Sequence, residues 1–123
     1  MREDARLWEQ DFGVWDGRDY GDLPDLGTLG GPALAHHAPE GGESFSDMAA
    51  RVAPALHDAA RAALAEGPVA VVAHAGTVRA GLALALDDVS GALAFEVGHL
   101  SATRLRCLTG GVFSVISVNG VLA

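Results

Sequence analysis

The apolar run Val69–Ala73 and the residues that follow it constrain the fold most. Five small apolar residues in a row, three of them valine, predict a β-strand buried on both faces. His74 comes next, and a helical pattern begins soon after it with Val78 and Leu82. A polar side chain at such a transition lies at the carboxyl edge of a sheet, beside the positive end of the helix dipole. The pattern indicates an anion site there, although His74 as a simple hydrogen-bonded strand end remains the alternative.

Composition narrows the classes of protein. A chain of 123 residues predicts one domain with a real core, built mainly from Ala, Val and Leu because only 6% of residues are aromatic. The net charge of −8 argues against nucleic-acid or anionic-membrane partners. One cysteine, Cys107, forms no intrachain disulfide, and the charged start at Met1–Asp11 lacks a signal peptide's apolar core. A cytoplasmic location is therefore expected.

A long helix is predicted over Ser44–Glu66. Ser44 and Asp47 have the spacing of a capping box, and apolar residues then follow one helical face. The pair Gly67–Pro68 is typical of a helix end. Pro54 falls within the pattern and predicts a kink.

The remaining periodicity predicts an α/β domain with an antiparallel edge. A second helix is expected over Thr77–Leu86, and a short one within Val89–Val97. Leu100–Leu108 and Val112–Val118 alternate as strands, and the glycines between them predict a hairpin. The order of helices and strands places this chain in the α/β class.

The N-terminal third has less regular patterns. Residues 7–17 are dense in large apolar groups, and the glycines among them indicate a tight loop with a close backbone approach. Asp19–Gly42 is interpreted as a long surface loop with room for one helical turn, a lid or binding loop by its length. His36 and His37 are adjacent, which is poor spacing for metal ligands, so no metal is expected.

Several polar residues are candidates for chemistry. Glu9 lies between two tryptophan-containing clusters, where partial burial suits a general acid, although a solvated charge is the simpler interpretation. Arg79 either faces the anion or pairs with an acid. The others are interpreted as helix-start residues, as solvated or ion-paired arginines, and as surface or turn histidines: Glu43, Ser44, Arg51, Arg61, His57 and His99.

Three motifs in order give a specific resemblance. They are Leu7-x-Glu9-x-x-Phe12-Gly13-x-Trp15-x-Gly17, then Gly42-Glu43-Ser44 with Asp47 and Arg51-Val52, then Val72-Ala73-His74-Ala75-Gly76-x-x-Arg79. Together they resemble the histidine phosphatase, or phosphoglycerate mutase-like, superfamily, in particular small bacterial phosphatases such as alpha-ribazole phosphatase. Two C-terminal segments are also similar to the family's last strands: Leu100–Thr103 and Val118–Asn119.

The resemblance implies a fold and roles for particular residues. The fold is a three-layer sandwich whose mostly parallel sheet ends in an antiparallel pair. Glu9 matches the proton donor to the leaving alkoxide, and His74 matches the second catalytic histidine, which contacts the phosphoryl oxygens. The N–H of Ala75 adds a phosphate-binding donor. No cofactor is implied, and the ligand is a small phosphorylated molecule or inorganic phosphate. These roles agree with what phosphoryl transfer requires.

The family's Arg-His-Gly segment, whose histidine attacks phosphorus, is not found in the sequence; nor is its Ser-x-Leu-x-Arg-Ala segment. We therefore expect 1–123 to be a single, N-terminally incomplete domain of this type. It is either the C-terminal portion of a phosphatase or a non-catalytic remnant that binds an anion or a protein. Because the family's first two strands flank the one ending at His74, Val69–Ala73 needs another partner. The hairpin could supply it, but a second copy, in a symmetric homodimer, is favoured.

Overall fold

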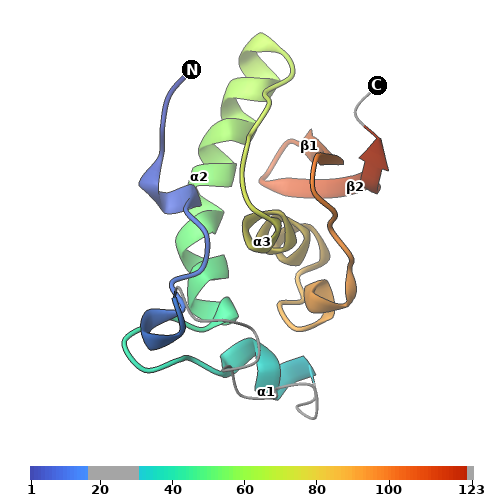
Figure 1. The fold of residues 1–123 in the computed structure, drawn as a ribbon. Helices are drawn as coiled ribbons and strands as arrows, with labels where there is room; N and C mark the ends of the chain where they lie inside the picture. Colours follow the sequence, from blue (N-terminus) through green and yellow to red (C-terminus); the bar gives the residue numbers. More distant parts are fainter. Residues whose placement is uncertain (17–30, 122–123) are drawn as a thin grey trace.

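The computed structural model describes residues 1–16 and 31–121 (Figure 1). Its elements, with 3₁₀ helices labelled η, are η1 (Ala5–Leu7), η2 (Gly13–Trp15), α1 (Gly31–His36), α2 (Phe45–Glu66), α3 (Ala75–Leu86), η4 (Gly91–Ala94), β1 (Ser101–Leu108) and β2 (Val112–Val121). Part of the predicted Asp19–Gly42 loop, together with Gly17, lies outside the described residues. The other part includes α1, a helix of six residues, where the sequence analysis expected room for one helical turn.

The helix α2 begins and ends where the sequence predicts. The Ser44 hydroxyl accepts a hydrogen bond from the Asp47 N–H at 3.0 Å, and the Asp47 carboxylate accepts one from the Ser44 N–H at 3.2 Å. At the other end Gly67 has a φ of 105° and donates to the Ala63 carbonyl. The capping box and the terminal glycine are thus confirmed.

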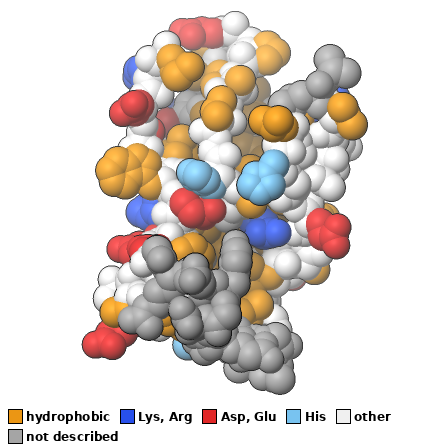
Figure 2. Space-filling view, viewed as in Figure 1, with side chains coloured by type: hydrophobic (Ala, Val, Ile, Leu, Met, Phe, Trp, Pro, Cys, Tyr) orange, Lys and Arg blue, Asp and Glu red, His pale blue; other side chains and the backbone are white. Residues whose placement is uncertain are grey.

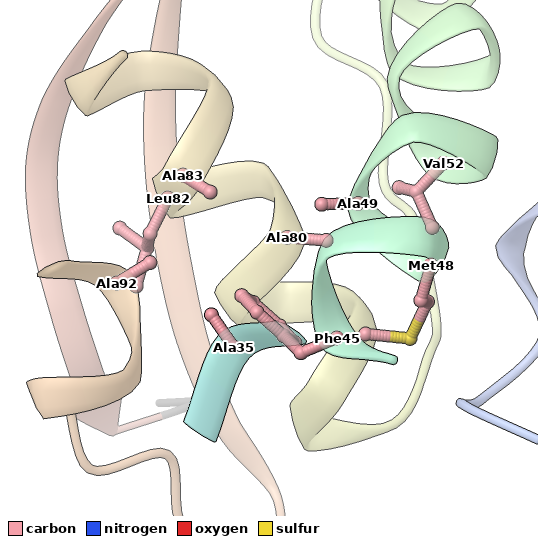
Figure 3. Packing of buried hydrophobic residues seen from close by; sticks show 9 residues of the cluster. All are labelled: Ala35, Phe45, Met48, Ala49, Val52, Ala80, Leu82, Ala83 and Ala92. Carbon is pink, nitrogen blue, oxygen red and sulfur yellow. The ribbon is translucent and has the colours of Figure 1, made fainter. Parts of the chain in front are cut away.

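The core lies between α2 and α3. Met48, Val52 and Leu82 are its largest fully buried side chains. Figure 3 shows Ala80 of α3 facing Ala49 of α2, so that small residues line the contact between the two helices. Small side chains allow close helix packing, and they make the core shallow, as the aromatic-poor composition predicts.

The C-terminal hairpin is also confirmed. Strands β1 and β2 pair antiparallel, from Ser101 opposite Val121 to Leu108 opposite Val112. A Cβ added to Gly81 of α3 would lie 3.8 Å from Leu105 Cδ1 of β1. The hairpin therefore rests on α3 through the side chains of one face.

The prediction of a buried strand over Val69–Ala73 is wrong. The segment is not a strand, it is exposed throughout, and the side chain of Val72 is 91% exposed. The sheet in the described residues contains only β1 and β2, so the mostly parallel sheet and three-layer sandwich are not found there. The physical reason is that an apolar run becomes a strand only when a neighbour pairs with its backbone. The hairpin pairs with itself and does not supply that neighbour.

Within the ranges that the structure describes, no helix has the length and apolar character needed to cross a membrane.

Candidate functional site at the start of α3

The start of α3 is the centre of the candidate site. His74 is the residue before the helix, with an extended backbone (φ −85°, ψ 166°) and an exposed side chain that makes no capping hydrogen bond. Ala75 is the first helical residue. The N–H groups of a first helical turn have no partner within the helix, and the dipole there favours an anion. The helix start expected after His74 is present although the preceding strand is not, and anion binding there stays a prediction.

Glu9 reaches the same helix end from a distant part of the chain. Its Oε2 accepts a hydrogen bond from the Gly76 N–H at 3.3 Å, and its Oε1 accepts one from the Gln10 N–H at 2.9 Å. A Cβ at Gly76 would overlap this carboxylate, so a larger residue there would require the Glu9 side chain to shift. The structure thus brings Glu9 and His74, which are far apart in sequence, to one end of α3.

Two surface cavities lie near the N-terminal loop. One, of about 300 Å³, is lined by Glu9, Glu43 and Arg51 among others, and the second, of about 160 Å³, by Trp15 and other residues. Neither has His74 in its lining. A depression shared by Glu9 and His74 stays a prediction. Figure 2 shows imidazole, acidic and basic side chains gathering in the middle of one face of the molecule.

The loop that carries Glu9 is held by close backbone contacts. A Cβ at Gly13, whose φ is +57°, would overlap the Glu40 carbonyl and the backbone of Gly42. The close approach expected of the N-terminal glycines is therefore confirmed for Gly13. In addition, the buried Thr77 hydroxyl donates to the Leu7 carbonyl at 2.9 Å, which ties this loop to α3.

The other candidate residues have structural contacts. Arg79 Nε donates to the Phe95 carbonyl at 2.9 Å and forms no ion pair within 1–16 and 31–121. His37 stacks on Trp15 with ring centroids 5.3 Å apart, and His57 packs against Phe113 at 5.5 Å. His99 is exposed in a turn before β1. Across the described ranges, no three His, Cys, Asp or Glu side chains come together as a metal site.

The structure confirms the ion-paired alternative for Arg51 and gives Glu43 contacts beyond those of a helix-start residue. Glu43 and Arg51 form an ion pair with 2.5 Å between Glu43 Oε1 and Arg51 Nη2, and both also contact the backbone around Glu9. The sequence contains little signal for this pair, because Glu43 lies before the N-cap of α2 and Arg51 is eight residues away, outside the three- and four-residue spacings that pair side chains on a helix. The contacts of this pair with the backbone around Glu9 could not be predicted from the spacing of the two residues.

Solved structures with the same fold include proteins described as a hydrolase and a phosphatase. A structure described as mycobacterial hydrolase 2 matches with a TM-score of 0.78 and 27% identity, over 98% of this chain and 60% of that one. A mycobacterial glucosyl-3-phosphoglycerate phosphatase in complex with VO3 matches with a TM-score of 0.77 and 29% identity, over 95% and 63%. YhfR of Bacillus stearothermophilus matches with a TM-score of 0.74 and 25% identity, over 98% and 61%. The fold is thus the α/β fold of a phosphatase class.

The family model of the histidine phosphatase superfamily (branch 1) matches residues 1–119. The chain belongs to this family, which confirms the resemblance seen in its motifs. No curated protein sequence matches it significantly. The chain spans about three fifths of the length of the first solved structures it matches.

Proposed function

We propose that this chain is the C-terminal portion of a histidine phosphatase that acts on phosphomonoesters through a phosphohistidine. The observation that carries the proposal is that the Glu9 carboxylate is bound at the start of α3, the helix that His74 precedes, in a chain of this family. Phosphoryl transfer needs a general acid that protonates the leaving group, and it needs hydrogen-bond donors that stabilise the charge on the phosphoryl oxygens.

The proposed chemistry assigns each group one task. The His74 imidazole and the Ala75 N–H donate hydrogen bonds to the phosphoryl oxygens as charge develops on them. The ester P–O bond breaks, and the departing alkoxide oxygen takes a proton from Glu9. Phosphorus forms its new bond to a histidine nitrogen that residues 1–123 do not supply, because they contain no Arg-His pair. Water then releases phosphate from that nitrogen.

Two observations support a small phosphorylated substrate: the net charge of this chain and the anions bound in similar solved structures. A chain with a net charge of −8 does not attract large polyanions, which favours a small phosphorylated molecule over nucleic acid. Solved structures of the similar mycobacterial phosphatase contain VO3 or inorganic phosphate. As part of the proposal, this chain binds such anions too. The proposed reaction uses no cofactor, and the proposed location is the cytoplasm.

The second candidate function is a non-catalytic module that binds an anion or a protein. The exposed valines of Val69–Ala73 favour it, since Val69, Val71 and Val72 are 46%, 42% and 91% exposed. Extended apolar backbone without a ladder partner is a template for pairing with another chain. This candidate needs no nucleophile.

Anion binding at the start of α3 tests what both candidates share. We expect His74→Ala to weaken the binding of inorganic phosphate or vanadate by about tenfold or more, since a hydrogen bond to a charged group contributes about 1.5–3 kcal/mol. Glu9→Gln should tighten binding, because it removes a negative charge at the start of α3 that repels the anion. Calorimetric titration measures both. His36→Ala, at the end of α1, is the matched control; equal losses in the two histidine variants would contradict the assignment.

Assembly is the next expected property. We propose that Val69–Ala73 pairs with a second copy in a homodimer or, in its place, with a missing N-terminal half. Light scattering at micromolar concentration should give the mass of a dimer for the chain by itself. Val71→Pro removes a backbone donor and should shift the protein to monomer, whereas Val71→Thr keeps that donor and should not. A stable wild-type monomer would rule out the dimer and leave pairing with the missing half.

A further inference from the structure

Arg51 makes an unusual set of contacts for an arginine on a helix surface. Its Nη1 donates to the carbonyls of Arg6 at 2.8 Å and Trp8 at 3.0 Å, and reaches that of Ala5 at 3.5 Å. Its Nη2 donates to the Glu9 carbonyl at 3.3 Å. These carbonyls belong to η1 and the residues just after it, where a helix end leaves acceptors without partners within the helix. The Ala5 carbonyl is the exception, since it already accepts from the Trp8 N–H. One guanidinium therefore holds the backbone up to and including Glu9.

Glu43 holds the backbone on the other side of Glu9. Its Oε1 accepts from the Asp11 N–H at 3.1 Å, its carbonyl accepts from Gln10 Nε2 at 2.9 Å, and its own N–H donates to the Asp11 carbonyl at 2.8 Å. The two oxygens of its carboxylate pair with Nη2 and Nε of Arg51. The ion pair thus connects the two stretches of backbone that flank Glu9.

We propose that Arg51, oriented by Glu43, is a positioning residue that holds the Glu9 carboxylate against the start of α3. The inference rests on the proposed function, in which Glu9 is the proton donor. Within residues 1–16 and 31–121, Arg51 forms no hydrogen bond with the start of α3; it acts through the Glu9 backbone. Its side chain is 28% exposed and that of Glu43 is 19% exposed, so the pair is partly shielded from water.

The contacts require the shape of a guanidinium. Its planar fork presents donors in several fixed directions, whereas the ammonium group of lysine is a compact point charge. A lysine at this position would keep the charge and much of the aliphatic stem but could not serve the carbonyls and the carboxylate together. Arg51→Lys therefore separates positioning from charge.

Hydrogen exchange at two amides provides the test. The Gly76 N–H is bound to Glu9, and the Asp47 N–H is bound to Ser44 at the start of α2. In the whole chain we expect Arg51→Met and Arg51→Lys to accelerate exchange at Gly76 by about tenfold, as for loss of one hydrogen bond, and to leave exchange at Asp47 within twofold. Arg61→Met is the matched control, since Arg61 lies on the same helix and pairs only with Asp58 in the described residues.

Each outcome decides the matter. Faster exchange at Gly76 alone supports positioning, and Glu43→Gln should reproduce it. Unchanged exchange at Gly76 in both Arg51 variants would overturn the proposal, as would equal acceleration at Gly76 and Asp47. Unfolding of both variants would also overturn it, because Arg51 would then hold the whole domain rather than Glu9. The readout needs no enzymatic turnover, so a chain that binds no phosphate yet shows the Gly76 effect would refute the proposed function and retain the positioning role.

Discussion

The isolated 123-residue chain should hydrolyse an aryl phosphate no faster than a mock preparation does. Removing the nucleophile of a well-studied hydrolase costs on the order of 10⁶ in kcat, because the covalent route is closed. Adding a polypeptide that carries the family's Arg-His-Gly strand should restore turnover, together with acid-labile phosphohistidine on the added polypeptide. A steady-state assay and phosphohistidine detection measure the two effects.

The controls separate complementation from contamination. The same polypeptide with alanine in place of its histidine should restore nothing. His74→Ala in this chain should abolish restored turnover, and Glu9→Gln should slow substrates with poor leaving groups more than those with good ones. Hydrolysis by the chain alone that is lost in His74→Ala would contradict the prediction and would require another nucleophile, such as water.

Leu82→Ala should destabilise the protein by about 2–5 kcal/mol, the range for a buried leucine truncated to alanine. Leu82 is 0% exposed, and Figure 3 shows it facing Ala92 of η4, a small residue that cannot move far to fill the space. Urea unfolding followed by circular dichroism measures the change in the free energy of unfolding.

Leu86→Ala provides the comparison on the same helix. Leu86 is 43% exposed, so its truncation removes less buried surface and should cost clearly less than truncation of Leu82. Equal losses for the two variants would mean that the core is not organised around Leu82. Loss of cooperativity in Leu82→Ala would instead show that this shallow core has no reserve of stability.

Local interactions made much of the fold readable from the sequence. The ends of α2 depend on the Ser44–Asp47 pair and on Gly67, residues adjacent in sequence to the groups they satisfy. The hairpin depends on strand alternation and a glycine-containing turn between β1 and β2. Family membership could also be predicted from the sequence, because it depends on three short motifs in a fixed order, and the family-model match confirms it.

The candidate site was readable in part. The sequence alone placed His74 directly before a helix, where its chemistry is set by its neighbours in the chain. The motif resemblance paired it with Glu9, but no local pattern showed that the Glu9 carboxylate would accept a hydrogen bond from Gly76, 67 positions away. Likewise, no pattern around Arg51 showed that its guanidinium would bind the carbonyls near Glu9.

The sequence by itself determined α2, the hairpin and the place of His74 just before α3, because caps, turns and side-chain periodicity are satisfied by near neighbours. Only the tertiary structure decided the state of Val69–Ala73 and the contacts that hold Glu9. A strand exists when another strand pairs with its backbone, and within the described residues Val69–Ala73 has none. The Glu43–Arg51 pair acts on Glu9 only because packing brings α2 against the N-terminal loop, and such long-range contacts leave no periodic signal in the chain.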